Sequence, residues 1–294
     1  MAHTLVPAAE EILDKEFPVL DHGFVRLVDY LGSDQRIVQS ARVSYGAGTK
    51  TVRRDRGLIR YLLRNEHTSP FEQVVFTFHA KLPIFVARQW IRHRTARLNE
   101  ISGRYSILSD EFYVPAADQI ALQSTDNKQG RSADPVEPAV AEEVREYLGQ
   151  GQKRAYKEYE ELLDKGIARE LARVNLPVSV YTEWYWQIDL HNLFRFLRLR
   201  LDAHAQAEIR AYASVMRDLA EKVCPIAFEA FDDYVLGGES MSRMEIDALR
   251  RLARHGEGGE IPPGDDPNRE ITKAGEEAGL SEKEIQQLIT KLGL

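Results

Sequence analysis

The amino-acid sequence predicts an α+β fold. Residues 74–82 alternate apolar and polar side chains, which is the pattern of a strand with one buried face. Residues 33–42 begin with Ser33-Asp34, a pair that can cap the start of a helix. A long charged stretch ends at Gly166, and glycine is the residue most typical of helix C-termini. Strands and helices therefore occur in the same part of the chain.

The first predicted elements are a strand, a helix and a second strand. Residues 24–30 form the first strand, which ends near Gly32, and the helix follows to about Arg42. One face of the second strand carries Phe76, Phe78, Ala80 and Leu82. The opposite face carries Val75, Thr77, His79 and Lys81. We therefore interpret His79 as a residue of the sheet face and not as a ligand.

A helix is predicted to begin at Pro83 and to continue to about Arg94, because the fixed φ of proline suits the first helical turn. Helical spacing stacks Arg88 over Arg92 and Gln89 over His93. The apolar side chains of this segment are expected in the core: Ile84, Phe85, Val86, Trp90 and Ile91.

The middle of the chain combines a surface loop with longer elements. Residues 115–137 are rich in Asp, Asn, Gly and Pro, and they should form a surface excursion before the charged helix. Residues 178–190 carry β-branched and aromatic side chains, which fit either an extended segment or a packed apolar helix. Residues 194–202 alternate in the manner of a strand.

Residues 239–294 are predicted to form an appendage, whose role the sequence does not indicate. Met241–His255 is a candidate helix, and residues 256–267 form a linker rich in Gly and Pro. A second helix starts near Ser281, because Ser281 and Glu284 have the spacing of a capping box.

Segment 92–105 concentrates positive charge in an acidic chain. It holds four arginines, whereas the formal net charge of the 294 residues is −7 at pH 7. Guanidinium groups bind phosphate or carboxylate through paired hydrogen bonds, so the segment predicts a site for a small anion. Asn99, Glu100 and Ser102-Gly103 add polar groups and a close backbone approach, which suit a nucleotide. The net charge argues against a general attraction to nucleic acid or to anionic lipid.

Other residue types narrow the chemistry. Cys224 is the one cysteine, so an intramolecular disulfide and a thiolate metal site are both excluded, and its apolar surroundings predict an inert packed thiol. The eight histidines lack metal-ligand spacing, so no metal site is predicted. No dinucleotide-binding Gly-x-Gly-x-x-Gly follows a strand. Without an export signal or an apolar run of membrane length, a cytoplasmic location is expected.

The order of residues in segment 92–105 resembles the signature of the flavin-dependent thymidylate synthases: Arg92-His93-Arg94, Asn99-Glu100, Ser102 and Arg104-Tyr105. Further similar motifs are Gly23–Val25, Ala41–Ser44, His67–Glu72, Pro83–Trp90 and Leu199–Gln206. The resemblance covers about residues 20–235 and stops after about Gly237. It therefore implies a catalytic domain at residues 1–238, followed by the appendage at 239–294.

The resemblance implies a twisted, mainly antiparallel sheet flanked by long helices, in a homotetramer with active sites shared between subunits. It also implies a helix at residues 194–202. The implied reaction is reductive methylation of dUMP to dTMP without a protein nucleophile. In that reaction 5,10-methylenetetrahydrofolate gives the carbon, and NADPH reduces the FAD that gives the hydride. Arg200 matches the arginine that stabilises negative charge on the pyrimidine, an effect typically worth a few kcal/mol.

Motif matching gives the expected binding residues. Those for dUMP are Gln89, Trp90, Ile91, Arg92, Glu100, Ile101, Ser102, Gly103, Arg104, Arg173 and Arg200. Those for FAD are His67, Ser69, Glu72, Arg92, His93, Arg94, Glu100, Asp189, Leu190, His191 and Arg195. Arg97 and Arg195 depart from the residues usual in the family; Arg195 is kept in the FAD set, and Arg97 is not assigned to the site.

Two alternative functions remain open. One is a flavoprotein that methylates uracil within RNA. The other is a nucleic-acid-binding module that uses the arginines of segment 92–105, which would bind long polynucleotides with a steep salt dependence. The expected partners are dUMP and further copies of the chain, with neither nucleic acid nor a membrane.

Overall fold

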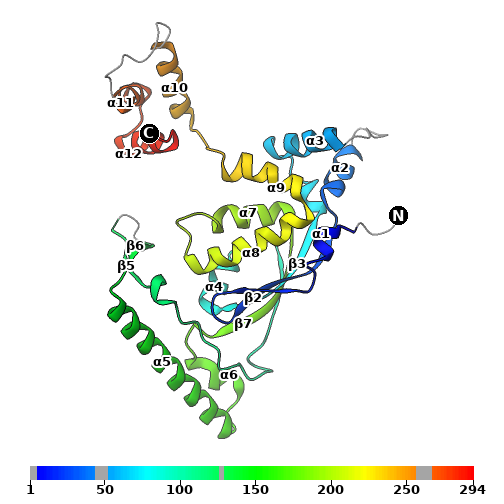
Figure 1. Ribbon diagram of the computed structural model, residues 1–294, viewed down its shortest axis with the longest axis vertical. Helices are drawn as coiled ribbons and strands as arrows, with labels where there is room; N and C mark the ends of the chain where they lie inside the picture. Colours follow the sequence, from blue (N-terminus) through cyan, green and yellow to red (C-terminus); the bar gives the residue numbers. More distant parts are fainter. Residues whose placement is uncertain (1–4, 44–51, 126–128, 256–266) are drawn as a thin grey trace. The chain divides into compact units, whose positions relative to one another are not determined.

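The computed structural model describes residues 5–43, 52–125, 129–255 and 267–294. It divides the chain into two compact units, Met1–Tyr234 and Val235–Leu294. The larger unit contains a five-stranded sheet with the order β1-β2-β3-β7-β4, in which every neighbouring pair is antiparallel (Figure 1). Its strands are β1 (Glu16–Val19), β2 (Gly23–Leu31), β3 (Val75–Pro83), β4 (Arg97–Glu100) and β7 (Tyr181–Asp189). The predicted α+β class and antiparallel sheet are confirmed.

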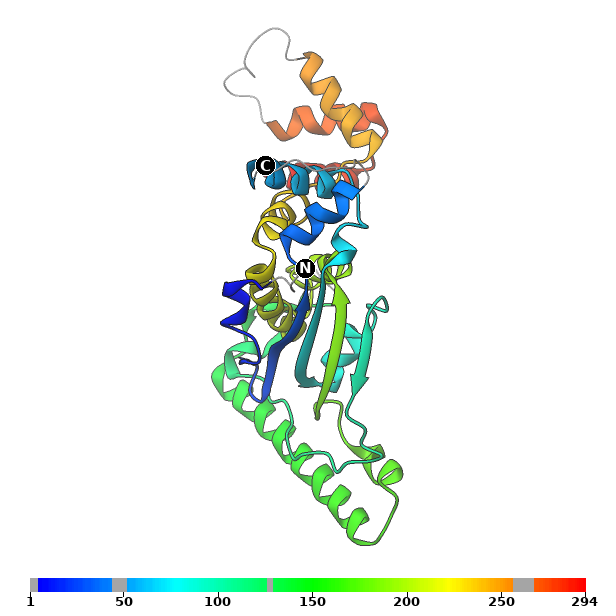
Figure 2. The same ribbon diagram turned by 90° about the vertical axis from the view of Figure 1, so that its right-hand side faces the viewer.

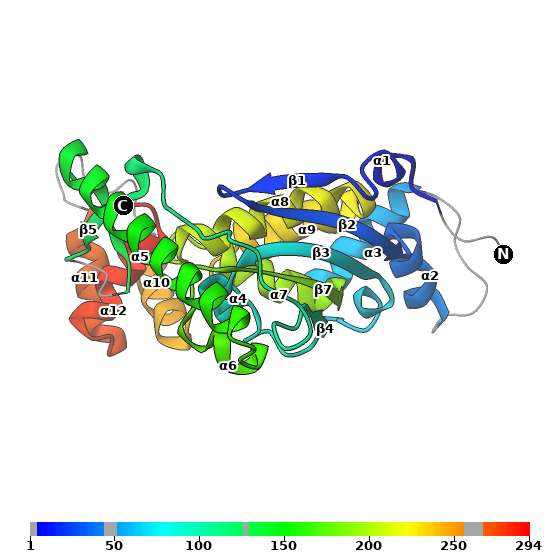
Figure 3. The ribbon, with the colours of Figure 1, turned by 90° about the horizontal axis from the view of Figure 1, so that it is seen from below.

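Helices of the larger unit cover one face of this sheet, where α4, α7 and α8 contact its central strands (Figure 3). The helices are α1 (Pro7–Glu10), α2 (Asp34–Arg42), α3 (Val52–Arg64), α4 (Ile84–Trp90), α5 (Pro138–Asp164), α6 (Arg169–Ala172), α7 (Leu190–Arg200), α8 (Ala207–Val223) and α9 (Pro225–Phe231). Short 3₁₀ helices are η2 (Phe71–Gln73), η3 (Ala117–Gln119) and η4 (Arg173–Asn175). A π-helical segment, η5 (Asp232–Leu236), spans the sequence boundary between the two units. Among the described residues, no helix is both long and apolar enough to cross a membrane.

Strand β3 shows the alternation that the sequence predicts. Phe76, Phe78, Ala80 and Leu82 are fully buried on the helix-covered face. On the other face the imidazole of His79 stacks on Tyr185, with ring centroids 4.5 Å apart. Its Nε2 lies 2.6 Å from Glu183 Oε1, and its Nδ1 lies 2.8 Å from an Arg26 nitrogen. His79 is therefore a sheet-face residue, as predicted.

The helix expected at residues 83–94 is shorter than predicted. Pro83 ends β3, and α4 ends at Trp90, so Arg92 and His93 lie in a turn. Ile91 was expected in the core, but its side chain is 48% exposed. The physical reason is a long-range one: the chain must reverse after Trp90 so that β4 can pair with β7 from Arg97 to Glu100. Helical periodicity contains no information about that pairing.

The structure also confirms, or decides between, the predictions made for residues 115–202. Residues 115–137 contain an exposed hairpin of β5 (Ala121–Gln123) and β6 (Arg131–Pro135). Helix α5 leads to Gly166 at φ +75°, and it extends away from the sheet (Figure 2). Strand β7 shows that residues 181–189 are extended. Residues 190–200 are helical, as the family resemblance implied and the local alternation did not.

The smaller unit contains α10 (Arg243–His255), α11 (Pro267–Ala278) and α12 (Glu282–Lys291). The predicted capping box at Ser281 and Glu284 is present, and Ser242 and Glu245 form a second one at the start of α10. The core of this unit consists of Ala248, Ile271, Ala274, Leu280, Ile285, Leu288 and Ile289. The prediction that the linker ends at Pro267 is wrong, because Pro267 is the first residue of helix α11. The predicted linker residues 256–266 lie outside the described residues.

Gly23 is required where β2 passes α8. The hydroxyl of Tyr212 donates to the carbonyl of Lys81 at 2.8 Å directly above this position. A Cβ atom at residue 23 would lie 2.0 Å from Tyr212 Oη and 2.7 Å from two carbonyl oxygens, those of Lys81 and Val19. We expect Gly23→Ala to lower the free energy of unfolding by about 1–3 kcal/mol, the usual cost of overpacking. Urea denaturation measures this change.

Gly57 in α3 is the matched control, since no atom lies within 4 Å of a Cβ placed there. Gly57→Ala should raise the free energy of unfolding by about 0.5–1 kcal/mol through helix propensity. Equal stability of Gly23→Ala and the unaltered protein would contradict the close approach of Tyr212.

Candidate functional site

The first cluster of predicted site residues, here called the Arg200 group, consists of Gln89, His93 and Arg200. Arg200 Nε donates to His93 Nε2 at 3.1 Å, and Arg200 Nη2 donates to the carbonyl oxygen of Gln89 at 3.3 Å. The C-terminal end of α7 is thereby joined to α4 and the turn that follows it. The guanidinium of Arg200 is held in one orientation by two acceptors, whereas its Nη1 has no protein partner among the described residues.

The imidazole of His93 is neutral near pH 7. Burial lowers its pKa to about 4, and the positive charges of Arg200 and Arg195 contribute in the same direction. A neutral imidazole offers one nitrogen as an acceptor, and the hydrogen bond from Arg200 identifies that atom as Nε2. The proton therefore resides on Nδ1. The ring also packs edge-on against Phe196, with centroids 4.9 Å apart.

Packing fixes the backbone of the Arg200 group. The side chain of Trp90, fully buried, packs at 5.4 Å from Trp184, 5.3 Å from Trp186 and 5.1 Å from Phe196 between ring centroids. Trp90 and the equally buried Leu190 were expected at the dUMP and FAD sites, but their side chains belong to the core. Only their backbone atoms remain for ligand contacts.

The second cluster, here called the Gly103 group, consists of Ser102, Gly103, Arg104 and Arg173. Gly103 is buried, and a Cβ at this position would lie 3.1 Å from Arg173 Cδ and 3.2 Å from Arg173 Nη1. Arg104 Nε donates to Glu170 Oε2 at 3.1 Å, and the backbone N–H of Arg104 donates to Ser102 Oγ at 3.2 Å. The absence of a side chain at Gly103 therefore allows the Arg173 guanidinium to lie directly against the loop.

Glu100 stands between the two groups in sequence, at the end of β4. The buried hydroxyl of Thr182 in β7 donates to Glu100 Oε1 at 2.5 Å. The N–H of Ile101, whose side chain is 43% exposed, donates to the carbonyl of Glu183 at 2.9 Å. Strand β7 thus orients a carboxylate that lies on an exposed edge strand. Sequence reasoning missed Thr182, because only the pairing of β4 with β7 brings it to Glu100.

Two segments that carry residues expected around FAD, residues 67–74 and the start of α7, pack against each other. The N–H of Leu190 donates to the carbonyl of Val74 at 2.8 Å, which attaches α7 to the segment after η2. Phe71 packs on Phe194, with centroids 6.2 Å apart. The nearby positions His67, Ser69 and Glu72 are exposed, and His191 is half-buried. The carboxylate of Asp189 is the N-cap of α7.

Besides Arg200, four predicted site arginines lack a carboxylate partner among the described residues. These are Arg92, Arg94, Arg173 and Arg195, and all except the half-buried Arg173 are exposed. Arg97 lies on the exposed edge strand β4 and is within 3.5 Å of Gln187. Guanidinium groups without protein acceptors are available to anionic ligands.

No hydrogen bond or ion pair joins the Arg200 group to the Gly103 group in the described part of the chain. Arg173 directly follows helix α6. In Figure 1, α6 lies beside α5 at the lower end of the view, whereas α7 lies over the sheet. Seven of the predicted site residues therefore fall into two groups that make no direct polar contact with each other within one described chain.

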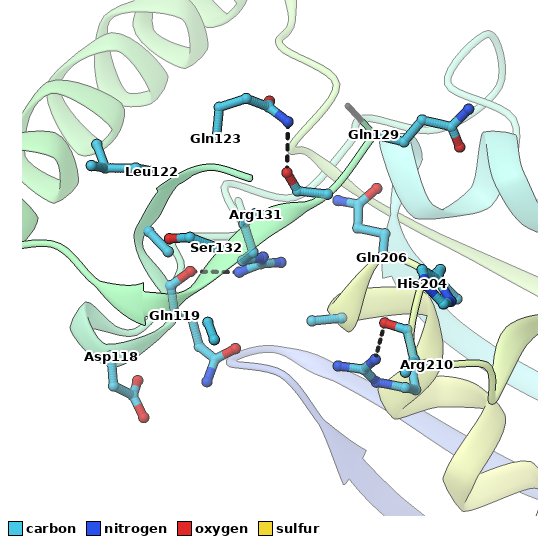
Figure 4. A pocket seen from close by; sticks show the side chains of 16 residues that line it. Asp118, Gln119, Leu122, Gln123, Gln129, Arg131, Ser132, His204, Gln206 and Arg210 are labelled. Atoms are coloured by element: carbon cyan, nitrogen blue, oxygen red, sulfur yellow. Dashed lines mark hydrogen bonds between the residues drawn. The ribbon is translucent and has the colours of Figure 1, made fainter. Parts of the chain in front are cut away.

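A cavity of about 790 Å³ lies between the β5–β6 hairpin and the residues that lead into α8 (Figure 4). Gln206 lines it and makes a short hydrogen bond with the amide of Gln89. Arg131 and Arg210 are tied to the carbonyl oxygens of Gln119 and Ala203, respectively. Gln206 belongs to the family-like motif Leu199–Gln206, but the motif alone does not indicate that its side chain reaches Gln89.

Known proteins similar to this chain agree with one another. Residues 26–226 match the family described as "Thymidylate synthase complementing protein". A flavin-dependent thymidylate synthase of Treponema denticola is 61% identical over 280 residues, which cover 95% of this chain and 98% of that protein. The corresponding protein of Treponema pallidum is 60% identical over 252 residues, with 86% and 83% covered.

Solved structures add a further similarity. The UMP/dUMP methylase PolB from Streptomyces cacaoi, bound with 5-Br dUMP, has a TM-score of 0.68 and 36% identity. The match covers 74% of this chain and 98% of that one. Because the Treponema denticola alignment leaves about 5% of this chain unmatched, it must extend into residues 239–294. The expectation that similarity stops after Gly237 is therefore wrong for that relative.

The depressed pKa of His93 gives the stability of the fold a pH dependence. The unfolded chain takes up this proton near pH 6.5 and the folded chain only near pH 4. The free energy of unfolding should therefore decrease as the pH falls from about 6.5 through about 4, and this contribution should be absent above that range. Histidine NMR titration of the unaltered protein should report a pKa of about 4 for His93.

Arg200→Gln supplies the comparison for His93, because it removes one of the two positive charges that depress the pKa. The pKa of His93 should rise in this variant, and the pH range of the stability loss should move upward with it. A value near 6.5 in the unaltered protein would contradict the buried, neutral imidazole.

Proposed function

Because the chain belongs to the flavin-dependent thymidylate synthase family, we propose that the clusters described above form its dUMP and FAD sites. The chain is an enzyme of this family, which methylates dUMP to dTMP and depends on a flavin. The finer assignments are part of the proposal: FAD as the flavin, 5,10-methylenetetrahydrofolate as the carbon donor and NADPH as the reductant. FAD, when bound and reduced by NADPH, would supply the hydride of the reductive methylation.

The proposed phosphate site of dUMP is the Gly103 group, and the contact of Arg173 with Gly103 is the observation that carries this assignment. Arg173 has no carboxylate partner among the described residues, and it lies beside a loop with no side chain at Gly103. A guanidinium next to open backbone is suited to a phosphate dianion. Arg104 would exchange its partner Glu170 for the phosphate.

The proposed pyrimidine site is the Arg200 group. Two acceptors, His93 Nε2 and the carbonyl of Gln89, hold the guanidinium in place before any ligand arrives. Nη1 then offers a fixed donor to the negative charge that develops on the ring during methylation. Such preorganised donors are typically worth about 3–4 kcal/mol in the transition state.

The chain's nucleophilic side chains are unsuited to attack the pyrimidine. Cys224 is fully buried, and burial raises the pKa of its thiol well above the ordinary value. Ser102 Oγ accepts from the Arg104 N–H, and no histidine lies within hydrogen-bond distance of it in the described part of the chain. Serine without an adjacent base is a weak nucleophile, so we assign Ser102 to nucleotide binding.

The chemistry of the available side chains fits FAD. FAD carries a pyrophosphate, and the exposed guanidinium groups of Arg92, Arg94 and Arg195 have no carboxylate partners among the described residues. The exposed residues His67, Ser69 and Glu72 lie on the segment that packs against α7. These residues, together with His191, would hold the cofactor.

We also propose that the active site is completed between subunits of a homotetramer. The two clusters are separate within one chain, and exposed apolar side chains flank both of them. Beside the Arg200 group, Ile91 is 48% exposed. Beside the Gly103 group, Tyr105 is 77% exposed, Leu171 62% and Val174 75%. Burial of such residues favours association.

The function is tested by the reaction of the purified protein with free dUMP. NADPH should bleach a yellow flavin spectrum, and dUMP with methylenetetrahydrofolate should restore it and yield dTMP. Arg200→Ala should retain flavin but lower kcat by about 10²–10³-fold, since it removes a donor to developing charge. Arg154→Ala, at a position whose side chain is 82% exposed on α5, is the control and should match the unaltered enzyme. Methylation of RNA in preference to dUMP would overturn the substrate assignment.

Subunit sharing predicts complementation between inactive variants. Arg200→Ala and Arg173→Ala each damage a different cluster, so mixed oligomers contain sites with one intact cluster from each chain. Random mixing of equal amounts should restore about a quarter of the sites, measured as dTMP formed per flavin.

A mixture of Arg104→Ala and Arg173→Ala is the matched control. Both substitutions damage the Gly103 group, so no mixed site is intact and no recovery is expected. Equal recovery in the two mixtures, or none in the first, would contradict a site built from two subunits.

A further inference from the structure

The side-chain amide of Asn192 joins the turn after α4 to the first turn of α7. Its Nδ2 donates to Asp189 Oδ2 at 2.7 Å, and its backbone N–H donates to Asp189 Oδ1 at 2.9 Å. On the other side, the hydroxyl of Thr95 donates to Asn192 Oδ1 at 2.7 Å. Neither Asn192 nor Thr95 belongs to the predicted binding residues.

The chemistry of the three partners fixes the orientation of this amide. An ionised carboxylate only accepts hydrogen bonds, so the NH₂ of Asn192 must face Asp189. The carbonyl oxygen then faces Thr95, whose hydroxyl is free to donate. A flipped amide would set two acceptors against each other at Asp189, so the assignment does not depend on how the amide atoms are drawn.

The two segments that Asn192 connects carry the proposed flavin residues. The turn holds Arg92, His93 and Arg94 directly before Thr95, and α7 holds His191 and Arg195 on either side of Asn192. In the described part of the chain, the Thr95–Asn192 bond is the one hydrogen bond that ties residues 94–96 to α7. His93 is held by Arg200 and Arg97 by its pairing with β7, so between them Thr95 is the residue that ties the segment to α7.

We propose that Asn192 and Thr95 are positioning residues for the flavin site, which set the distance between Arg94 and the start of α7. The inference rests on the proposed FAD assignment. Asp189, which sequence matching placed at FAD, anchors this pair through its carboxylate. Loss of the pair leaves both segments in the fold but frees the Arg94 guanidinium to move away from α7.

The experiment measures the FAD dissociation constant of the purified full-length protein by quenching of flavin fluorescence, together with its thermal midpoint. Thr95→Val keeps the shape of the side chain and removes the donor, and we expect about three- to tenfold weaker FAD binding, the usual effect of one hydrogen bond. Thr95→Ser retains the donor and should recover most of that affinity.

Asn192→Asp is expected to weaken FAD binding more than Thr95→Val does. It removes the Nδ2 donor and places a second carboxylate beside Asp189, so repulsion replaces the hydrogen bond to Asp189 and displaces the oxygen that accepts from Thr95. Thr290→Val is the matched control, because Thr290 is also an exposed threonine with one hydrogen bond, to the carbonyl of Gln286. Its FAD affinity should equal that of the unaltered protein.

The outcomes separate this inference from the function on which it rests. Unchanged FAD affinity in both Thr95→Val and Asn192→Asp, with or without a lower thermal midpoint, would show a purely structural role and overturn the positioning pair alone. Failure of the unaltered protein to bind FAD would overturn the cofactor assignment and the pair together. Weaker binding in these two variants, with the Thr290→Val control unaffected, supports the proposal.

Discussion

The packing of Trp90 between the sheet and helices α7 and α8 is the interaction on which the candidate site depends. Its ring contacts Trp184 and Trp186 of β7, Phe196 of α7 and Tyr212 of α8. Large aromatic side chains contribute much burial and have few rotamers, so they fix the elements that carry them. Because Gln89 and Arg92 flank this core closely in sequence, the last turn of α4 is held while its polar residues remain at the surface.

The aromatic core around Trp90 also explains why His93 is neutral and why Arg200 is held in one orientation. Burial makes His93 a neutral acceptor, and a neutral acceptor is what allows a partly buried guanidinium to lie beside it without repulsion. The cost of removing Arg200 from water is offset by two fixed hydrogen bonds, so its free donor points in one direction. Glu100 is held in a similar way, because the hydroxyl of the buried Thr182 donates a hydrogen bond to its carboxylate.

Local sequence patterns predicted several helices and strands. The features that these patterns did not predict depend on pairing and packing between distant parts of the chain. Alternation identified β3 with its buried face, and the capping box identified α12. Ser33 stands at the N-cap of α2 as predicted, but its side chain makes no capping hydrogen bond. Residues 194–202 alternate like a strand yet form the end of α7, because Phe194 and Phe196 both find core partners on a helix. Segment 92–105 looked like a single cluster in sequence, but β4 passes through it and separates Arg92 from Arg104. Thr182, Gln206 and Asn192 reach the site only through tertiary contacts, which no local pattern encodes.

Strand β4 is short, and all four of its residues, Arg97-Leu98-Asn99-Glu100, are exposed at the edge of the sheet. An open edge with charged side chains resists pairing with strands of other molecules, whereas an uncharged one invites aggregation. In the proposed site, Glu100 therefore has two roles, in ligand binding and in keeping this edge charged. Substitutions that neutralise this edge would lower the soluble yield as well as activity, so selection for solubility and selection for catalysis act on the same few positions.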